Sequence, residues 1–339
     1  MIGAAPVRAP MRAAALALAL ALWSCVGQGT ADLSRTSAAA AAAAKPHLAT
    51  DAILADDGVR LPLRVWRPDG KVAATILALH GFNDYSNAFA GAAAAWAENG
   101  IATYAYDQRG FGEAPERGLW VGERRLGQDL AIASRLVAER NPGVRHYVLG
   151  ESMGAAVAMV AATGAAGSDP PVADGLILSA PAVWGRAAMN VFERVGLWAA
   201  YHVAPGMTLT GRGLGIVPSD NIEMLRALSR DPLVIKATRV DTIKGLVDLM
   251  DAALACAPLL RGRVLILHGA RDEIIPPEAV ERMIATLPVD ASRERRIAWY
   301  QDGYHMLMRD LQGAAVVRDI ASWIEDPKAP LPSGADQGG

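Results

Sequence analysis

The sequence feature that most restricts the fold of this chain is a repeated alternation of short apolar runs with longer helical patterns. Each of six apolar runs is closely followed by a Gly, Asp, Ser or His residue. Near-continuous apolar runs of this length are typical of strands that are buried on both faces of a parallel sheet. The six runs lie at 75–79, 102–106, 146–149, 175–178, 264–267 and 296–300.

Helical patterns lie between these runs, for example at 88–99, 127–140 and 277–287. Alternation of strands and helices predicts an α/β fold with an open, doubly wound and mostly parallel sheet. In such a sheet, ligands bind at the carboxyl ends of the strands. The polar residues that follow the runs would gather at this edge, so we expect the functional site there.

One interval breaks the alternation. The stretch between the runs at 175–178 and 264–267 is much longer than one crossover helix needs. We expect a mostly helical insertion, or cap, over the top of the sheet from 184 to about 256, with the segment after about 240 as a candidate to rejoin the core. The apolar residues of this interval include Trp184, Met189, Phe192, Trp198, Tyr201, Met207 and Leu209.

The first 25 residues have the pattern of an export signal. Arg8 and Arg12 supply a positive charge ahead of a continuous apolar run at 13–23. This run is too short for a bilayer span, which needs about 20 residues, but it suits the apolar region of a secretory signal. We therefore expect an exported protein of the bacterial cell envelope, either a membrane-anchored lipoprotein or a periplasmic protein.

The signal ends in Leu22-Trp23-Ser24-Cys25, which resembles the lipobox of bacterial lipoproteins. In that motif the cysteine becomes the lipidated first residue of the mature chain. Cys25 would then attach the protein to a membrane. The alternatives are an ordinary cleaved signal peptide and an uncleaved anchor.

Low-complexity segments flank the body of the chain. Residues 26–47 are rich in Ala, Gly, Ser and Thr, which is typical of a tether, and 327–339 is rich in Pro, Gly and Ser, which predicts a disordered tail. The folded domain is therefore expected at 48–326. Cys25 and Cys256 are the two cysteines of the sequence, too few for a disulfide framework.

The charge balance excludes two classes of protein. The chain has 33 Lys and Arg against 35 Asp and Glu, a formal net charge of −2. This balance argues against a nucleic-acid-binding protein with a basic surface and against an acidic disordered protein. The sequence contains no Cys/His cluster with zinc spacing, so we expect no metal site. Nothing in the sequence predicts a protein partner.

The segment Gly150-Glu151-Ser152-Met153-Gly154 matches G-x-S-x-G. It follows a predicted strand and opens an apolar helical segment, which is the context of a nucleophile elbow. In this turn the glycines allow the chain to reverse sharply and expose the serine hydroxyl. The alternative is a chance Gly/Ser turn. We expect Ser152 to be a nucleophile.

A serine hydroxyl needs a base to accept its proton. His305 follows the last predicted strand and completes the chain order Ser, Asp, His that an elbow on this kind of sheet requires. The orienting acid should follow the preceding strand, where Asp272 is our choice and Glu273 the alternative. Asp107 also follows a strand, but it precedes Ser152, so we interpret it as a structural residue in a turn.

The developing oxyanion needs hydrogen-bond donors. One would be the backbone N–H of Met153, directly after the nucleophile. The second should come from the loop after an early strand. The segment His80-Gly81-Phe82-Asn83 fits this loop, so we expect the N–H of Phe82 to be the second donor.

Five motifs together resemble the monoacylglycerol lipase and lysophospholipase group of α/β-hydrolases, of the serine aminopeptidase S33 type. They are His80-Gly81, the stretch 106–112 (Tyr-Asp-Gln-Arg-Gly-Phe-Gly), the elbow at 150–154, His268-Gly269 with Asp272, and His305. The resemblance implies an α/β-hydrolase fold, a helical cap over an acyl pocket and no cofactor. This chain departs from the group at Ala155, where a second glycine is usual, and at 112–115, which replaces Gly-x-Ser.

These observations predict a serine hydrolase that cleaves carboxylic esters of lipids. The alternatives are an esterase for small or aryl esters, a peptidase of the same fold, and a non-catalytic lipid-binding envelope protein. We expect part of the cap to form a tunnel to Ser152, although its apolar residues could instead form a core of the cap itself. The candidates for substrate contact are Trp184, Met189, Phe192, Trp198 and Met207.

Overall fold

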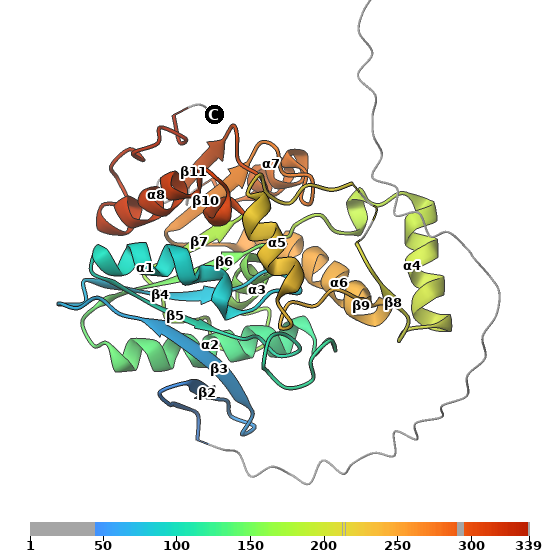
Figure 1. The fold of residues 1–339 in the computed structure, drawn as a ribbon, viewed down its shortest axis with the longest axis horizontal. Helices are drawn as coiled ribbons and strands as arrows, with labels where there is room; N and C mark the ends of the chain where they lie inside the picture. Colours follow the sequence, from blue (N-terminus) through green and yellow to red (C-terminus); the bar gives the residue numbers. More distant parts are fainter. Residues whose placement is uncertain (1–44, 212, 214, 290–294, 338–339) are drawn as a thin grey trace, which may run out of the picture.

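The computed structural model describes residues 45–211, 213, 215–289 and 295–337. Its central element is a nine-stranded sheet with the order β1-β2-β3-β5-β4-β6-β7-β10-β11, flanked by helices (Figure 1). This is the α/β-hydrolase fold that the sequence predicted. The proposed export signal, Cys25 and almost all of the predicted tether lie outside the described residues.

The six predicted strands form the parallel part of the sheet. All but β11 are fully or almost fully buried, as the apolar runs require. These strands are β4 (Ala74–Leu79), β5 (Ile101–Tyr106), β6 (Arg145–Glu151), β7 (Gly175–Ser179), β10 (Val264–Gly269) and β11 (Arg295–Tyr300).

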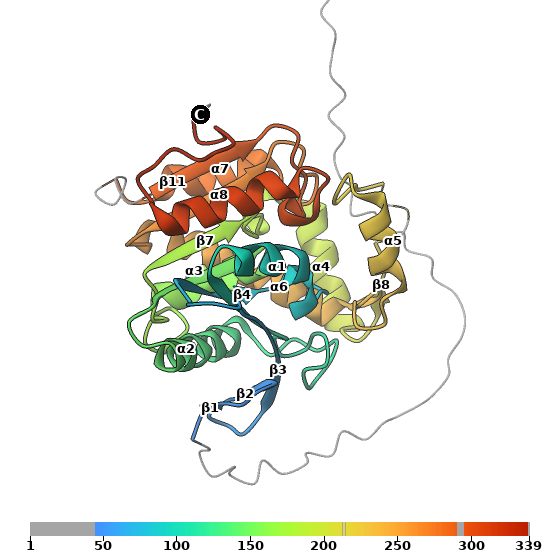
Figure 2. The ribbon, with the colours of Figure 1, turned by 60° about the vertical axis from the view of Figure 1, so that its left-hand side comes forward.

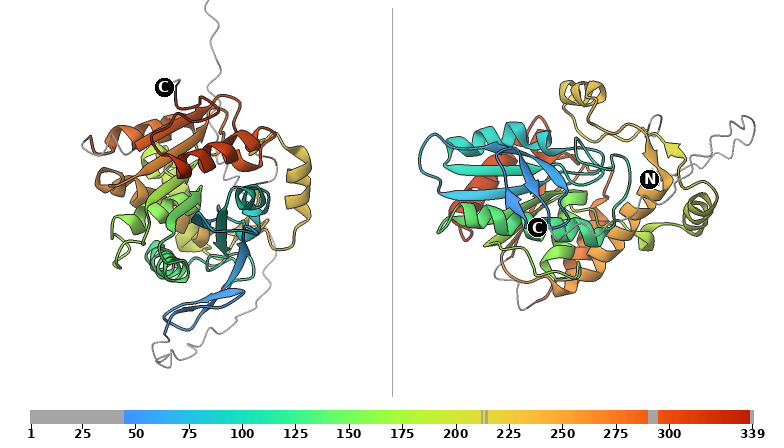
Figure 3. Two further views of the ribbon diagram at one scale, coloured as in Figure 1. Left: turned by 90° about the vertical axis from the view of Figure 1, so that its left-hand side faces the viewer. Right: turned by 90° about the horizontal axis from the view of Figure 1, so that it is seen from below.

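Three further strands extend one end of the sheet in antiparallel order. They are drawn in blue in Figure 3, and they are β1 (His47–Leu48), β2 (Ala52–Leu54) and β3 (Arg60–Trp66). The sequence analysis did not predict them, because two are very short and β3 alternates buried with half-buried residues instead of forming an apolar run.

Helices cover both faces of the sheet and bury two separate cores. One core lies under α1 and α8, where Trp96 and Trp323 are almost completely buried. The other core lies under α2, α3, α6 and α7. The bounds are α1 (Ala90–Glu98), α2 (Glu123–Arg140), α3 (Met153–Ala162), α6 (Val240–Cys256), α7 (Pro277–Thr286) and α8 (Gly313–Glu325).

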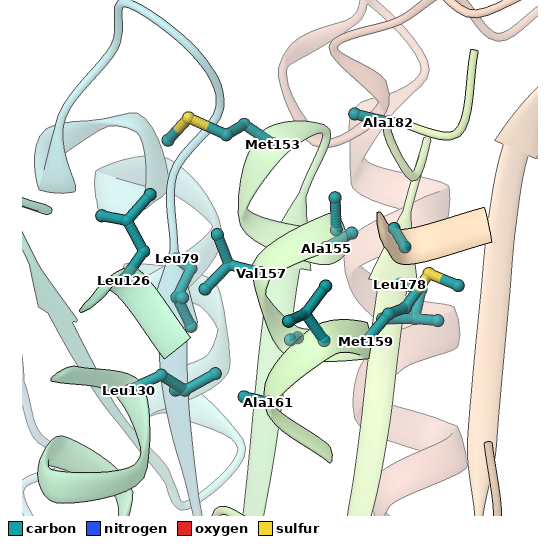
Figure 4. Packing of buried hydrophobic residues seen from close by; sticks show 14 of the residues in the cluster. Leu79, Leu126, Leu130, Met153, Ala155, Val157, Met159, Ala161, Leu178 and Ala182 are labelled. Atoms are coloured by element: carbon teal, nitrogen blue, oxygen red, sulfur yellow. The ribbon is translucent and has the colours of Figure 1, made fainter. Parts of the chain in front are cut away.

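Helix α3 is the most deeply buried of these helices. Its residues from Met153 to Ala161 are all buried. Figure 4 shows Val157 beside Leu79 and the α2 residue Leu126 on one side of the helix, and Met159 beside Leu178 on the other. Because α3 begins directly after Ser152, this packing fixes the position of that residue.

The cap lies beyond the carboxyl ends of the parallel strands (Figures 1 and 2). It contains η2 (Arg186–Ala188), α4 (Val191–Val203), β8 (Thr208–Leu209), α5 (Ile222–Arg230) and β9 (Thr238–Arg239), with β8 and β9 paired antiparallel. Helix α6 packs against α3, and its buried side chains belong to the main core. The segment after about 240 therefore rejoins the core, as the sequence analysis considered, and the cap ends near 239 instead of at about 256.

The prediction of a disordered tail at 327–339 is wrong for the residues that the structure describes. Leu331 is buried, the hydroxyl of Ser333 donates to Asp319 of α8, and the carbonyl of Ala335 accepts a hydrogen bond of 2.9 Å from the N–H of Trp299. Arg296 of β11 pairs with Asp336. The composition indicated disorder, but partners on β11 and α8 hold the segment.

Within the described part of the chain, no helix has both the length and the apolar character that crossing a membrane requires. Cys256, at the end of α6, is buried and is a free thiol. Its position in the main core agrees with the packing role that its apolar neighbours indicate.

Candidate active site

Ser152 lies in a sharp turn between β6 and α3 and has an unusual backbone conformation. Its φ is +53° and its ψ is −113°, which side chains other than glycine seldom adopt. Strained backbone of this kind concentrates at functional sites, and it is the geometry of a nucleophile elbow. The hydrogen bond from the N–H of Ser152 to the carbonyl of Ser179, 2.9 Å long, joins the turn to β7.

The two glycines of the motif are required by close contacts. A Cβ atom at Gly150 would lie 2.3 Å from the backbone nitrogen of Ala155, and one at Gly154 would lie 2.2 Å from the carbonyl oxygen of Leu79. Neither position can hold a side chain without moving backbone. Ala155, where a second glycine is usual, is buried in the core, so its methyl group is accommodated.

His305 and Asp272 form a buried pair at the carboxyl edge of the sheet. The distance between Nδ1 of His305 and Oδ2 of Asp272 is 2.7 Å. Burial alone would lower the pKa of His305, but the negative charge and the hydrogen bond of Asp272 raise it above its ordinary value. Nε2, the other ring nitrogen, is left for a proton from a nucleophile.

Asp272 is held in place by the turn that follows β10. Its Oδ1 accepts hydrogen bonds from the N–H groups of Ile274 and Ile275, at 2.8 and 2.9 Å. Burial would raise the pKa of Asp272, but His305, His268 and the N–H of Ile275 hold it below its ordinary value, so the carboxylate is charged. Glu273, the alternative acid, instead accepts from the N–H of Val217.

The two predicted oxyanion donors belong to two segments next to Ser152. Met153 is the first residue of α3, where a backbone N–H has no acceptor within the helix. The loop that contains Phe82 passes directly beside the serine, because a Cβ atom at Gly81 would lie only 3.5 Å from Cβ of Ser152. The loop and the helix N-terminus together can stabilise negative charge next to Ser152.

A buried histidine anchors this loop. Nε2 of His80 accepts a hydrogen bond of 3.0 Å from the N–H of Gln108, and the side chain of Gln108 donates to the carbonyl of His80 at 2.9 Å. Burial lowers the pKa of His80, so its ring is neutral and can accept this bond. Asp107 accepts from the N–H groups of Ser86 and Glu113, which is the structural role expected of it.

Ser152 and His305 both line a cavity of about 340 Å³. One end is polar, and the remaining wall is apolar apart from Glu193 of α4. The apolar wall comes from the cap, from α6 and from the turn after Asp272, and consists of Phe82, Ala182, Trp184, Met189, Leu197, Ile243, Leu246, Val247, Met250, Ile274, Ile275 and Met306. A cavity of this kind and size is typical of a small-molecule site.

The structure divides the five predicted cap residues into two groups. Trp184 and Met189 line the cavity with Ser152. Phe192 and Trp198 are 84% and 63% exposed, and Met207 is 44% exposed, and none of the three lines it. Their proposed contact with substrate is therefore corrected: they lie on the outer surface of the cap, while Leu197 of the same helix α4 points inward.

Sequence reasoning missed three charged residues at the polar end of the cavity. Asp84, Glu151 and Arg309 line it together with Ser152. A signal for Glu151 and Asp84 was present, because Glu151 immediately precedes the nucleophile and Asp84 is two residues beyond Phe82. Nothing in the sequence pattern distinguished Arg309 from the other arginines.

Two other histidines are buried but do not line the cavity with Ser152 and His305. His146 contacts the hydroxyls of Thr75 and Ser134 on the far side of the sheet. His268 lies 3.9 Å from Asp272. Burial lowers the pKa of both histidines to about 4, so both are neutral near pH 7. In the described ranges there is no group of three or more His, Cys, Asp or Glu residues that could hold a metal ion.

Comparison with known families and sequences agrees with this arrangement. The family model described as serine aminopeptidase, S33, matches residues 70–312. The mouse (Mus musculus) protein "Monoglyceride lipase" is 25% identical over 290 residues, which cover 82% of this chain and 89% of the mouse protein. The human (Homo sapiens) protein of that name is 23% identical over 295 residues, or 84% of this chain and 91% of its own.

Solved structures share the fold. The monoacylglycerol lipase of Paleococcus ferrophilus has a TM-score of 0.64 at 22% identity and covers 78% of this chain and 98% of its own. A soluble variant of the monoglyceride lipase of Saccharomyces cerevisiae, in complex with a substrate analog, has a TM-score of 0.66 at 21% identity and covers 79% and 92%.

Proposed function

This chain belongs to the serine aminopeptidase S33 family and is an α/β-hydrolase of the lipase and esterase type, and from that premise we propose that it hydrolyses carboxylic esters of monoacylglycerols or lysophospholipids. In this proposal Ser152, Asp272 and His305 act as the catalytic triad. No cofactor takes part.

The observation that carries the proposal is the polarity of the cavity. Ser152 and His305 lie beside charged side chains at one end, and the rest of the wall is apolar apart from Glu193 of α4. An amphipathic ester fits this division, with its acyl chain along the apolar wall and its alcohol at the polar end. Each methylene that the wall removes from water stabilises the complex by about 0.8 kcal/mol.

The first half of the proposed reaction forms an acyl-enzyme. Oγ of Ser152 attacks the ester carbonyl while Nε2 of His305 takes the hydroxyl proton. Asp272 stabilises the imidazolium that results. The N–H groups of Met153 and Phe82 donate to the carbonyl oxygen as it becomes negative. The tetrahedral intermediate then collapses, and His305 gives its proton to the oxygen of the leaving alcohol.

The second half releases the acid. Water takes the place of the alcohol and loses a proton to His305 as it attacks the acyl-enzyme. The same N–H groups stabilise the second tetrahedral intermediate. Collapse returns the proton to Oγ of Ser152 and frees the fatty acid.

A fluorophosphonate probe and an ester screen test the proposal together. The purified protein is expected to be labelled at Ser152, and Ser152→Ala is the matched control that should not be labelled. The screen compares monoacylglycerols, lysophospholipids and p-nitrophenyl esters of two to sixteen carbons, below micelle formation. We expect kcat/KM to rise about three- to four-fold per methylene until the cavity is full, the factor that corresponds to about 0.8 kcal/mol.

Each alternative function gives a different result in these experiments. A steady decline from acetate to longer acids would contradict the lipase assignment and favour an esterase for small esters. Cleavage of peptide substrates without ester hydrolysis would favour a peptidase. Absence of both labelling and hydrolysis would favour a lipid-binding protein without catalysis.

We further propose that the chain is exported and attached to a membrane through Cys25, on the evidence of Arg8, Arg12 and the apolar run at 13–23. Cell fractionation of the wild type and Cys25→Ser tests this. The variant should move to the soluble fraction, while Cys256→Ser, which leaves Cys25 intact, should remain with the membrane. Equal distribution of the wild type and Cys25→Ser would exclude Cys25 as the lipid site.

A further inference from the structure

A buried cluster of three charged side chains lies beside Ser152 and His305. Nη1 of Arg309 is 2.7 Å from Oδ2 of Asp84, and Nη2 of Arg309 is 2.7 Å from Oε1 of Glu151. The three side chains are 12%, 8% and 3% exposed, respectively. Ion pairs this deeply buried are weak evidence for a purely stabilising role, because desolvation opposes the attraction between the charges.

The cluster connects the three segments that carry the catalytic groups. Arg309 ends the short helix η5 (Leu307–Arg309), four residues after His305. Asp84 is in the loop of Phe82. Glu151 immediately precedes Ser152. One guanidinium therefore contacts the segment of the base, the segment of an oxyanion donor and the segment of the nucleophile.

The cluster is also incompletely satisfied. Oε2 of Glu151 and Nε of Arg309 are both buried, and neither has a hydrogen-bond partner among the described residues. Two carboxylates share one guanidinium, which leaves an excess negative charge at the cavity. Buried polar atoms usually have partners, and exceptions concentrate at functional sites. A cluster built only for stability would be expected to pair these atoms.

The excess charge faces His305. Glu151 favours the protonated imidazole, and Arg309 opposes it. Several elements contribute the charged and titratable groups that surround His305 and can affect its protonation. These are Asp272 and His268 from β10 and the turn after it, Glu151 from β6, Asp84 from the loop after β4, Arg309 and Asp310 from the segment of His305, and Glu193 from α4, across the cavity.

We propose that Arg309 is a positioning residue, whose guanidinium holds the segments of His305, Ser152 and Phe82 in register and balances the negative charge that Glu151 presents to His305. This inference rests on the proposed function, because it assigns Arg309 a role in the same site. It predicts that removing Arg309 and removing Glu151 shift the protonation of His305 in opposite directions. Removal of Arg309 favours imidazolium, which cannot accept the serine proton, and removal of Glu151 favours neutral imidazole.

The test is the pH dependence of kcat/KM with a neutral ester, followed by pH-stat titration. Arg309→Met should move the acidic midpoint upward by roughly one pH unit, because the cation that opposes protonation of His305 is removed. Glu151→Gln should move it downward. Arg309→Lys, which keeps the charge but lacks the planar fork, should return the midpoint towards the wild type with only partial recovery of kcat.

Arg186→Met is the matched control. Arg186 likewise joins two carboxylates, those of Asp248 and Asp251, but it does not line the cavity. Its replacement should leave the midpoint unchanged. Arg309 would have no role in charge balance if the midpoints of Arg309→Met and Glu151→Gln were both unchanged or moved in the same direction.

A thermal melt of each variant accompanies the profiles. If Arg309→Met does not fold, the pH profiles of Glu151→Gln and Arg309→Lys decide. A lower midpoint in Glu151→Gln, together with a near-normal midpoint in Arg309→Lys, supports the inference. An unchanged midpoint in Glu151→Gln overturns it. Failure of the proposed function is distinct, because the wild type would then show neither fluorophosphonate labelling nor ester hydrolysis.

Discussion

Helices α3 and α4 are both apolar, but α3 is almost completely buried and α4 is largely exposed. Every residue of α3 from Met153 to Ala161 is buried between the sheet and the neighbouring helices. In α4 only Leu197 is buried, and Phe192 and Val203 are 84% exposed. The first helix belongs to the body and the second to the cap.

The difference shows that apolar composition predicts burial only where a second layer of structure covers the helix. Helix α3 has small apolar side chains on all sides, and it is surrounded by the sheet and by helices α2 and α6. Helix α4 lies at the edge of the molecule with neighbours on one side, so its other side remains in water (Figure 1). Catalytic activity should therefore be sensitive to single substitutions of the site residues that the main domain holds. Substitutions on the outer face of the cap should change activity little.

The largest expected effect is at Ser152 in the body. Ser152→Ala should keep the fold and lower kcat by roughly 10⁴–10⁶, the range for loss of a triad nucleophile. The measurement is steady-state hydrolysis with a melting curve to confirm folding. A purified variant that retained more than a tenth of the wild-type activity would remove Ser152 from the mechanism.

The next effect separates two adjacent acids. Asp272→Asn should lower kcat by about 10³–10⁴, because it removes the charge that orients and stabilises His305. Glu273→Gln is the matched control and should change kcat little, since Glu273 accepts from the N–H of Val217 instead. If Glu273→Gln proved the more damaging variant, the two roles would have to be exchanged.

The pH dependence follows from His305. Its pKa is raised by Asp272, and only the neutral ring accepts the serine proton. Activity should therefore be constant at high pH and fall as pH decreases through a midpoint above the ordinary value of about 6.5. Two pH units below the midpoint, kcat/KM should be roughly a hundred-fold lower.

The measurement is kcat/KM for a neutral ester from pH 5 to 9. In Asp272→Asn the residual activity should show a lower midpoint, because the charge that raises the pKa is gone. A profile of the wild type that stayed flat to pH 5 would contradict a histidine base.

The smallest effect compares two neighbours on α4. Leu197→Ala should lower kcat/KM for a long-chain ester by about ten-fold, because Leu197 lines the cavity. Trp198→Ala should change it less than about two-fold with a monomeric substrate, although it removes a larger side chain. Equal losses in both variants, with unchanged melting temperatures, would show that the outer face of α4 also contributes to catalysis.

The sequence by itself determined the parts of the fold that depend on local chemistry. Continuous apolar runs predicted the six parallel strands, because a strand that is covered on both faces cannot tolerate polar residues. The glycines around Ser152 predicted the turn, since no side chain fits at Gly150 or Gly154. The order of the motifs along the chain predicted Asp272 and His305. In the structure Oδ2 of Asp272 and Nδ1 of His305 are 2.7 Å apart.

Only the tertiary structure decided the features that depend on distant partners. The described part of the segment after Pro327 is ordered because β11 and α8 offer partners to Leu331, Ser333 and Asp336, although its composition predicted disorder. Whether an apolar cap residue faces substrate or water depended on how α4 docks. The contact of Arg309 with Asp84 and Glu151 joins residues 225 and 158 positions apart, and no local pattern encodes a pairing of that range.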